Sequence, residues 1–150
     1  MADTELATAH RSGILRLDVV TPAGVAVHTD VDQVEAPSVA GEFGVLPGHL
    51  PLLAALKPGV VRYRSEGKTF VLAVGAGFAE AGPDTMTILT DRCVEGGDVD
   101  VAAARTELER ATAKIDAFSG IHAGEEYDEL ARVSLWAQAQ LDAARESGRN

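Results

Sequence analysis

The spacing of apolar residues changes once along this 150-residue chain, at Gly96-Gly97, and that change limits the folds that the sequence can adopt. Between residues 14 and 96, apolar and polar residues alternate in short segments, which is the pattern of half-buried β-strands. After residue 97, apolar residues recur at every third or fourth position, as in helices with one buried face. The sequence therefore predicts an α+β protein in which the strands come first and the helices last.

The segment 14–20 shows the strand pattern most clearly, because its apolar residues alternate with charged ones. The residues on its apolar side are Leu15, Leu17 and Val19. Glycine, proline and aspartate residues typical of turns separate it from the further strand segments. Short strands at this spacing favour a sandwich, so we expect residues 13–97 to form an N-terminal antiparallel β-sandwich, preceded by a flexible tail at residues 1–12.

Residues 98–150 are expected to form a C-terminal antiparallel hairpin of two helices joined by a short loop. Asp98 or Asp100 can cap the first helix, and Glu125 and Glu126 suit the start of the second. The apolar stripe of the first helix consists of Val101, Ala104, Leu108, Ala111, Ile115 and Phe118. The stripe of the second consists of Tyr127, Leu130, Ser134, Ala137, Leu141 and Ala144. Because alanine buries little surface, helix-on-helix docking should be modest, which would permit the hairpin to move.

The composition argues against several classes of partner and location. A net charge of −10 repels a phosphate backbone, so we expect no nucleic acid partner. No apolar run approaches the roughly 18 residues that a spanning helix needs, so we expect no direct membrane insertion. The polar start lacks the apolar centre of a secretory signal. The single cysteine, Cys93, cannot form an internal disulfide, which fits a reducing cytoplasm.

Few residues stand in arrangements that support chemistry. The histidines, at positions 10, 28, 49 and 122, lack the spacing of metal ligands, so no metal site is expected. Cys93 lies in a strand pattern and is expected to be a buried, inert thiol. Gly75-Ala76-Gly77 lacks the third glycine of a dinucleotide loop and is better explained by strands that bend. Glu42 and His49 could form an acid/base pair, a solvated loop tip or a protein-contact loop.

The segment 41–59 is the most specific stretch of the chain, with Gly-Glu-Phe-Gly, then Pro-Gly-His-Leu-Pro, then Lys-Pro-Gly. Its glycines free the backbone, and its prolines stiffen it. This pattern strongly resembles the epsilon subunit of bacterial and chloroplast F-type ATP synthases, which is equivalent to the mitochondrial delta subunit. The resemblance extends from residue 15 into the helical hairpin and leaves out only the first dozen residues.

The resemblance implies a non-catalytic central-stalk (rotor) subunit, which couples ion flow through the membrane c-ring to ATP synthesis by the catalytic head. It implies three partners: the gamma subunit on one sandwich face, the c-ring at one end of the sandwich, and the alpha/beta head through the C-terminal helices. The location would be peripheral, on the cytoplasmic face of the bacterial inner membrane. The expected c-ring-facing loop comprises Glu42, Phe43, Gly44, Leu46, Pro47, Gly48 and His49.

In relatives, the C-terminal helices can lie folded on the sandwich or extend into the head and inhibit ATP hydrolysis. Basic residues on the second helix then meet acidic segments of the head. Here residues 125–149 carry six acidic residues against three arginines. Because this acidic excess opposes that contact, we expect inhibition to be weak or conditional.

Some bacterial relatives bind ATP on the folded hairpin, through a motif that opens the first helix with Ile/Leu-Asp-x-x-Arg-Ala. The aligned residues here are Val99, Asp100, Ala103 and Ala104, so Ala103 replaces the arginine. Arg105 cannot substitute for it, because two positions along a helix rotate the side chain by about 200°. The motif is therefore degenerate, and we expect no cofactor and weak or absent ATP binding.

Two other functions stay open at the level of the sequence. One is a stand-alone ligand-binding β-sandwich, and the other is a small hydrolase that uses His49 and Glu42. The stalk interpretation requires a tight complex with a gamma-like subunit, whereas the hydrolase requires turnover by the isolated chain. The pattern does not distinguish H⁺ from Na⁺ as the coupling ion.

Overall fold

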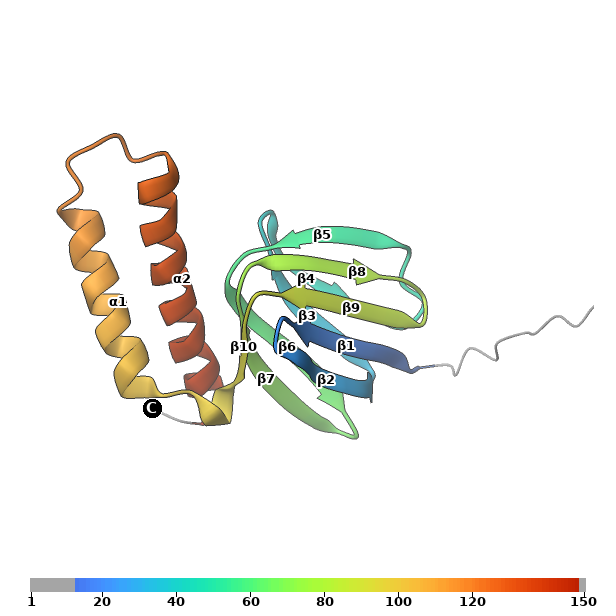
Figure 1. The fold of residues 1–150 in the computed structure, drawn as a ribbon. Coiled ribbons are helices and arrows are strands. Elements are labelled where there is room, and N and C mark those ends of the chain that lie inside the picture. The colour runs from blue at the N-terminus through green and yellow to red at the C-terminus, as the bar shows by residue number, and fades with distance from the viewer. Residues whose placement is uncertain (1–12, 149–150) are drawn as a thin grey trace, which may run out of the picture.

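The computed structural model describes residues 13–148, which form a β-sandwich followed by two helices (Figure 1). The tail expected at residues 1–12 lies outside the described residues. The strands of the described part are β1 (Leu15–Thr21), β2 (Gly24–Val31), β3 (Gln33–Ser38), β4 (Gly41–Val45), β5 (Leu52–Leu56), β6 (Gly59–Ser65), β7 (Lys68–Val74), β8 (Gly77–Ala81), β9 (Thr85–Thr90) and β10 (Cys93–Glu95). A short 3-10 helix, η1 (Gly96–Asp98), leads into α1 (Val101–Asp116) and α2 (Glu125–Glu146).

The strands pair in the order β10-β7-β6-β3-β5-β8-β9-β1-β2, with β4 added to β3, and the sheet folds over between β3 and β5. The resulting layers are β10-β7-β6-β3-β4 and β5-β8-β9-β1-β2, and the expected sandwich is confirmed. One pair departs from the all-antiparallel prediction, because β1 runs parallel to β9. No hairpin turn joins these two strands, so the chain does not force them to run in opposite directions.

The main core lies between the two layers. The side chains on the predicted apolar side of β1, Leu15, Leu17 and Val19, are fully buried there. They pack in one cluster with residues of the other layer, such as Val61 and Leu72. The alternating pattern therefore identified the correct face of this strand.

Gly77 is required by the close approach of β8 to β9. A Cβ atom at this position would lie 1.8 Å from the carbonyl oxygen of Leu89, which no side chain tolerates. Gly77 therefore serves the packing of β8 against β9, whereas the bending of strands that the sequence suggested for this segment stays a prediction.

The helical hairpin begins as predicted. The carboxylate of Asp100 accepts a hydrogen bond from the backbone N–H of Ala103 at 3.0 Å, which identifies Asp100 and not Asp98 as the N-cap. The expected stripes meet between the helices, where the fully buried members are alanines. They are Ala104 and Ala111 on α1 and Ala137 and Ala144 on α2.

A second face of α2 packs on the sandwich, and the sequence analysis did not identify it. Trp136, Ala139 and Ala143 are buried against Val60 of β6 and Ala73 of β7. We call these five residues the docking cluster. Figure 1 shows the consequence: α2 lies between α1 and the sandwich and covers the outer face of β6 and β7.

Candidate subunit interface

The loop that joins β4 to β5, residues 46–51, is exposed and is held in place by backbone hydrogen bonds. We call it the braced loop. Leu46 and Leu50 are 59% and 80% exposed. The backbone N–H of Gly48 donates to the carbonyl oxygen of Pro83, in the turn between β8 and β9, at 2.8 Å. The backbone N–H of His49 donates to the Leu46 carbonyl at 3.1 Å, and Gly48 has a φ of +85° that suits glycine. Such a loop presents apolar side chains to a partner in a fixed shape.

Glu42 and His49 do not lie together. Glu42 is the second residue of β4 and pairs with Pro37, whereas His49 follows the opposite end of that strand. The Glu42 carboxylate accepts a hydrogen bond from Arg62, and the His49 ring contacts the carbonyl of Leu50. An acid/base pair needs direct contact or one bridging water, so the structure offers no support for the hydrolase alternative.

The residues expected in one c-ring-facing loop therefore form two groups. Leu46, Pro47, Gly48 and His49 belong to the braced loop. Glu42, Phe43 and Gly44 belong to β4, where Phe43 packs partly against the main core. The prediction did not anticipate that a regular strand separates the acidic residue from the histidine.

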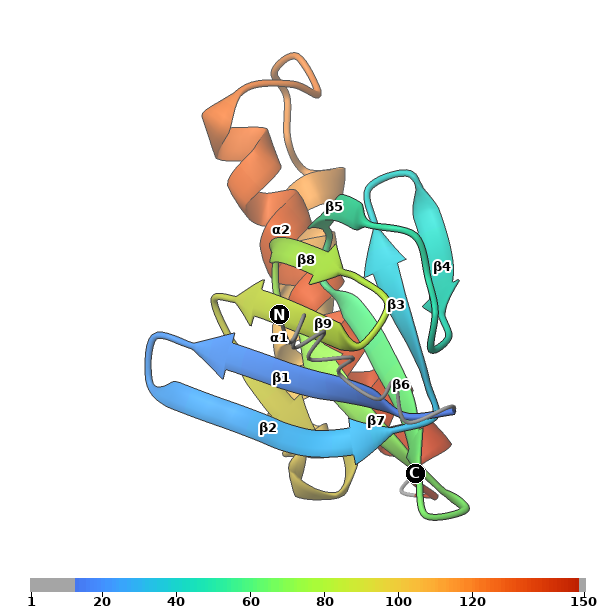
Figure 2. The ribbon, with the colours of Figure 1, turned by 90° about the vertical axis from the view of Figure 1, so that its right-hand side faces the viewer.

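An apolar band crosses the outer face of the layer β5-β8-β9-β1-β2. Phe78 on β8 lies opposite Leu89 on β9, and Leu89 lies beside Val20 on β1. We define the band by its strongly exposed members, which are Leu53, Phe78, Leu89 and Val25, at 71%, 56%, 52% and 64% exposure. Figure 2 shows this layer in front and the helices behind it.

The sequence contained a signal for this band that the analysis did not use. In the segment 77–81, Phe78 and Glu80 alternate with two alanines, and the alanines are the buried side. A strand that turns its phenylalanine outward is unusual unless a partner covers it. Exposed apolar side chains that gather in one patch mark interaction sites more often than scattered ones do.

Cys93 and His28 both lie in the sandwich and contact neighbouring residues there. Cys93 is half-buried, and burial raises the pKa of its thiol to about 11, so little thiolate exists at neutral pH. His28 is bonded to Asp18 on the neighbouring strand. Among residues 13–148, no cluster of histidine, cysteine and acidic side chains is arranged to hold a metal ion. None of the helices in this part of the chain is both long and apolar enough to cross a membrane.

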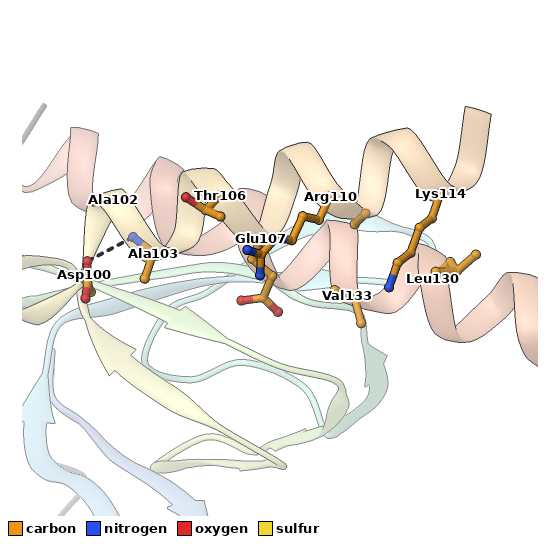
Figure 3. A pocket seen from close by; sticks show the side chains of 10 residues that line it. Asp100, Ala102, Ala103, Thr106, Glu107, Arg110, Lys114, Leu130 and Val133 are labelled. Carbon is orange, nitrogen blue, oxygen red and sulfur yellow. Dashed lines mark hydrogen bonds between the residues drawn. The ribbon is translucent and has the colours of Figure 1, made fainter. Parts of the chain in front are cut away.

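A cleft of about 620 Å³ lies between the two helices, at the side of α1 (Figure 3). Asp100 and Ala103 of the degenerate motif line it, with Arg110 and Lys114 further along α1. Val99 and Ala104 are buried and Arg105 is not among the lining residues, which agrees with the rotation argued from helix geometry. The position of the missing arginine therefore faces the cleft.

Comparison with known proteins assigns the sandwich to a family. Residues 14–96 match the family model described as ATP synthase, Delta/Epsilon chain, beta-sandwich domain. The chain is 42% identical over 103 residues to an ATP synthase epsilon chain of Anoxybacillus flavithermus, covering 69% of this chain and 77% of that one. It is 34% identical over 135 residues to an ATP synthase epsilon chain 2 of Syntrophotalea carbinolica, covering 90% of this chain and 96% of that one.

The fold also occurs in a solved structure. A chain of the Euglena gracilis mitochondrial ATP synthase, solved by cryo-electron microscopy with OSCP, F1 and c-ring, superposes with a TM-score of 0.73. The alignment covers 89% of this chain and 82% of that chain, at 23% sequence identity. At this identity the comparison shows a shared fold.

The cleft allows a test of the degenerate ATP motif. We expect the isolated chain to bind ATP weakly or not at all, and Ala103→Arg to tighten binding by about ten- to a hundredfold, because a guanidinium adds a charge-assisted hydrogen bond. Thr112→Arg is the matched control, since it adds the same charge on α1 at an exposed position that does not line the cleft. Calorimetric titration measures both. Saturable binding at micromolar ATP by the unchanged chain would show that Arg110 and Lys114 suffice.

Proposed function

Because the chain belongs to the ATP synthase delta/epsilon family, we propose that it is a central-stalk subunit of an F-type ATP synthase. In this role it turns with the rotor and couples ion flow through the c-ring to ATP synthesis by the catalytic head, without a catalytic residue of its own. The observation that carries the proposal is the match of the whole sandwich to the family model, extended into the hairpin by relatives aligned over 90% of the chain.

The apolar band is the surface that we assign to the gamma subunit. It lies on the layer whose outer face α2 leaves open, and it joins side chains from several strands into one surface. A rotor shaft must hold this subunit firmly, and burial of exposed leucine and phenylalanine side chains contributes to such affinity, because it removes apolar area from water.

The braced loop is the surface that we assign to the c-ring. It lies beside the turn between β8 and β9, at the end of the sandwich away from the helices (Figure 1). Its hydrogen bonds fix the backbone, so force can pass through it without deforming the loop. With this assignment, we propose that the chain is a peripheral subunit at the membrane surface, on the cytoplasmic face of the bacterial inner membrane.

The helical hairpin is the part that we assign to regulation of ATP hydrolysis in the alpha/beta head. The first turn of α2 contains Glu125, Glu126 and Asp128, and Asp142 and Glu146 follow near its other end. This acidic surface would repel acidic segments of the head. We therefore infer that the hairpin inhibits weakly.

The assignment of the apolar band to the gamma subunit can be tested by substituting one of its leucines. Leu89→Glu should weaken binding to the gamma subunit by at least about tenfold, because it places a charge in the centre of a desolvated contact. Leu135→Glu is the control, since Leu135 is also exposed, at 42%, but lies on α2. Affinity is measured with the purified gamma subunit. Equal binding by the two variants would remove the band from the interface.

The assignment of the braced loop to the c-ring is tested by measuring how well the assembled enzyme couples ion transport to ATP synthesis. Replacement of residues 46–49 by Gly-Ser-Gly-Ser should leave the sandwich folded and lower both proton pumping and ATP synthesis in reconstituted vesicles, because the stiff contact is lost. Replacement of Glu66, in the turn between β6 and β7, by glycine is the control, because it loosens an exposed turn elsewhere and keeps Gly67, whose φ of +76° suits glycine. The assignment fails if the loop variant couples as well as the control does.

Truncation tests the domain boundary that we propose at 97/98 and the role of the hairpin together. The fragment 1–97 should give the circular dichroism of a folded β-sandwich, because its main core contains no residue of the hairpin. In the assembled enzyme, loss of residues 98–150 should raise ATP hydrolysis only modestly, for the charge reason above. A large activation contradicts weak inhibition, and an unfolded fragment contradicts the boundary.

A further inference from the structure

The end of α2 lies in close contact with η1, the short helix that follows the last strand. A Cβ atom on Gly96, in η1, would lie 2.4 Å from the carbonyl oxygen of Ala143 and 1.9 Å from the hydroxyl of Ser147. Any side chain at position 96 would therefore push the end of α2 away. This contact shows that the docked position of the hairpin depends on a backbone-to-backbone fit at its C-terminal end.

A charged contact joins the same end of α2 to the sheet. The guanidinium of Arg62, on β6, donates from Nε to Oε2 of Glu146 at 2.6 Å and from Nη2 to Oε1 at 2.5 Å. Its third nitrogen, Nη1, donates to Glu42 on β4 and lies 3.6 Å from Glu35 on β3. One side chain therefore connects α2 with three strands of the sheet.

The geometry of this contact sets it apart from the surface ion pairs of the chain. It is bidentate, and the side chains of Arg62 and Glu146 are only 29% and 30% exposed. Arg64, on the same strand, reaches Asp32 at 3.9 Å with both side chains about half exposed. Bidentate, partly buried pairs are stronger than exposed single contacts, because solvent and salt screen them less.

Local helix energetics do not explain why a glutamate ends α2. Glu146 is the last helical residue, where the negative end of the helix dipole disfavours a carboxylate. Its hydrogen bonds raise the pKa of Arg62, a side chain that is charged at physiological pH in any case. The contact with Arg62 explains why a glutamate stands at this position.

We propose that the Arg62–Glu146 pair is the latch that holds the hairpin in its docked position on the sandwich. Glu42 and Glu35 position the guanidinium for that contact. The docking cluster supplies an apolar surface made of Trp136 with alanines and a valine, and the latch fixes the end of α2 where Gly96 allows a close approach. This inference concerns the isolated chain and does not depend on the assembly in which the chain functions.

A cysteine placed beneath α2 can report how often the hairpin undocks from the sandwich, because its thiol reacts only when the helix no longer covers it. Val60 belongs to the docking cluster and is 8% exposed, so Val60→Cys in a Cys93→Ser background places a single thiol under the helix. When docking is faster than chemical labelling, the labelling rate is proportional to the undocked fraction. Arg62→Met and Glu146→Ala should each raise this rate about five- to tenfold.

The two changes remove the same contact, so the double variant should label no faster than the faster single variant. Arg64→Met is the matched control for loss of an arginine on β6, and it should leave the rate unchanged. Gly96→Ala is the positive control, because its methyl group displaces α2 without a change in charge.

The latch is overturned if Gly96→Ala raises the rate while Arg62→Met and Glu146→Ala do not differ from Arg64→Met. It is also overturned if the effects of the two latch variants multiply, since independent effects would mean that they do not act on one contact. Circular dichroism checks that the sandwich stays folded. If Arg62→Met unfolds the sandwich, the labelling rate of Glu146→Ala alone tests the latch, since this variant removes the same contact from α2.

Discussion

The packing of α2 on the outer face of β6 and β7 determines what the rest of this molecule can offer to a partner. A sandwich has two outer faces, and here the chain covers one with Trp136, Ala139 and Ala143 of its own helix. The opposite layer keeps its apolar band uncovered. The hairpin therefore defines by exclusion which face of the sandwich is free for a stable subunit contact.

The same contact explains the choice of small residues along α2. Ala143 is fully buried beside Gly96, and this combination lets the end of α2 approach η1 at backbone distance. Alanine gains little from burial, however, since the hydrophobic gain scales with the apolar area removed from water. Trp136 supplies the largest side chain of the contact, and the guanidinium of Arg92 lies 5.1 Å above its ring. The docked state thus rests on a few specific contacts rather than on a broad apolar seam.

The sequence pattern predicted the local structure, but it did not predict which strands pair and which helix faces pack together. Alternation in β1 is a local signal that was correct, and of the two caps that the sequence offered, Asp98 and Asp100, the structure has Asp100. Two features depend on how the strands assemble: the parallel pairing of β1 with β9, and the separation of Glu42 from His49. The spacing of apolar residues along the sequence does not encode this assembly. In α2 the ambiguity has a specific cause. Ala144 packs with Ala104 of α1, whereas Ala139 and Ala143 pack with residues of the sheet. A helix rich in alanine does not show in its sequence which buried side contacts which neighbour.

A charged latch suits a contact that opens better than an apolar one does. If large apolar side chains held the end of α2, undocking would expose them to water, which favours aggregation or a permanent contact. Arg62 and Glu146 are each well hydrated when separated, and replacing such pairs by apolar residues often makes a contact tighter. The cluster of Arg62 with Glu35, Glu42 and Glu146 contains three carboxylates and one guanidinium, so repulsion among the acids offsets part of the attraction. This balance places the latch near the point where it can hold the hairpin and still release it.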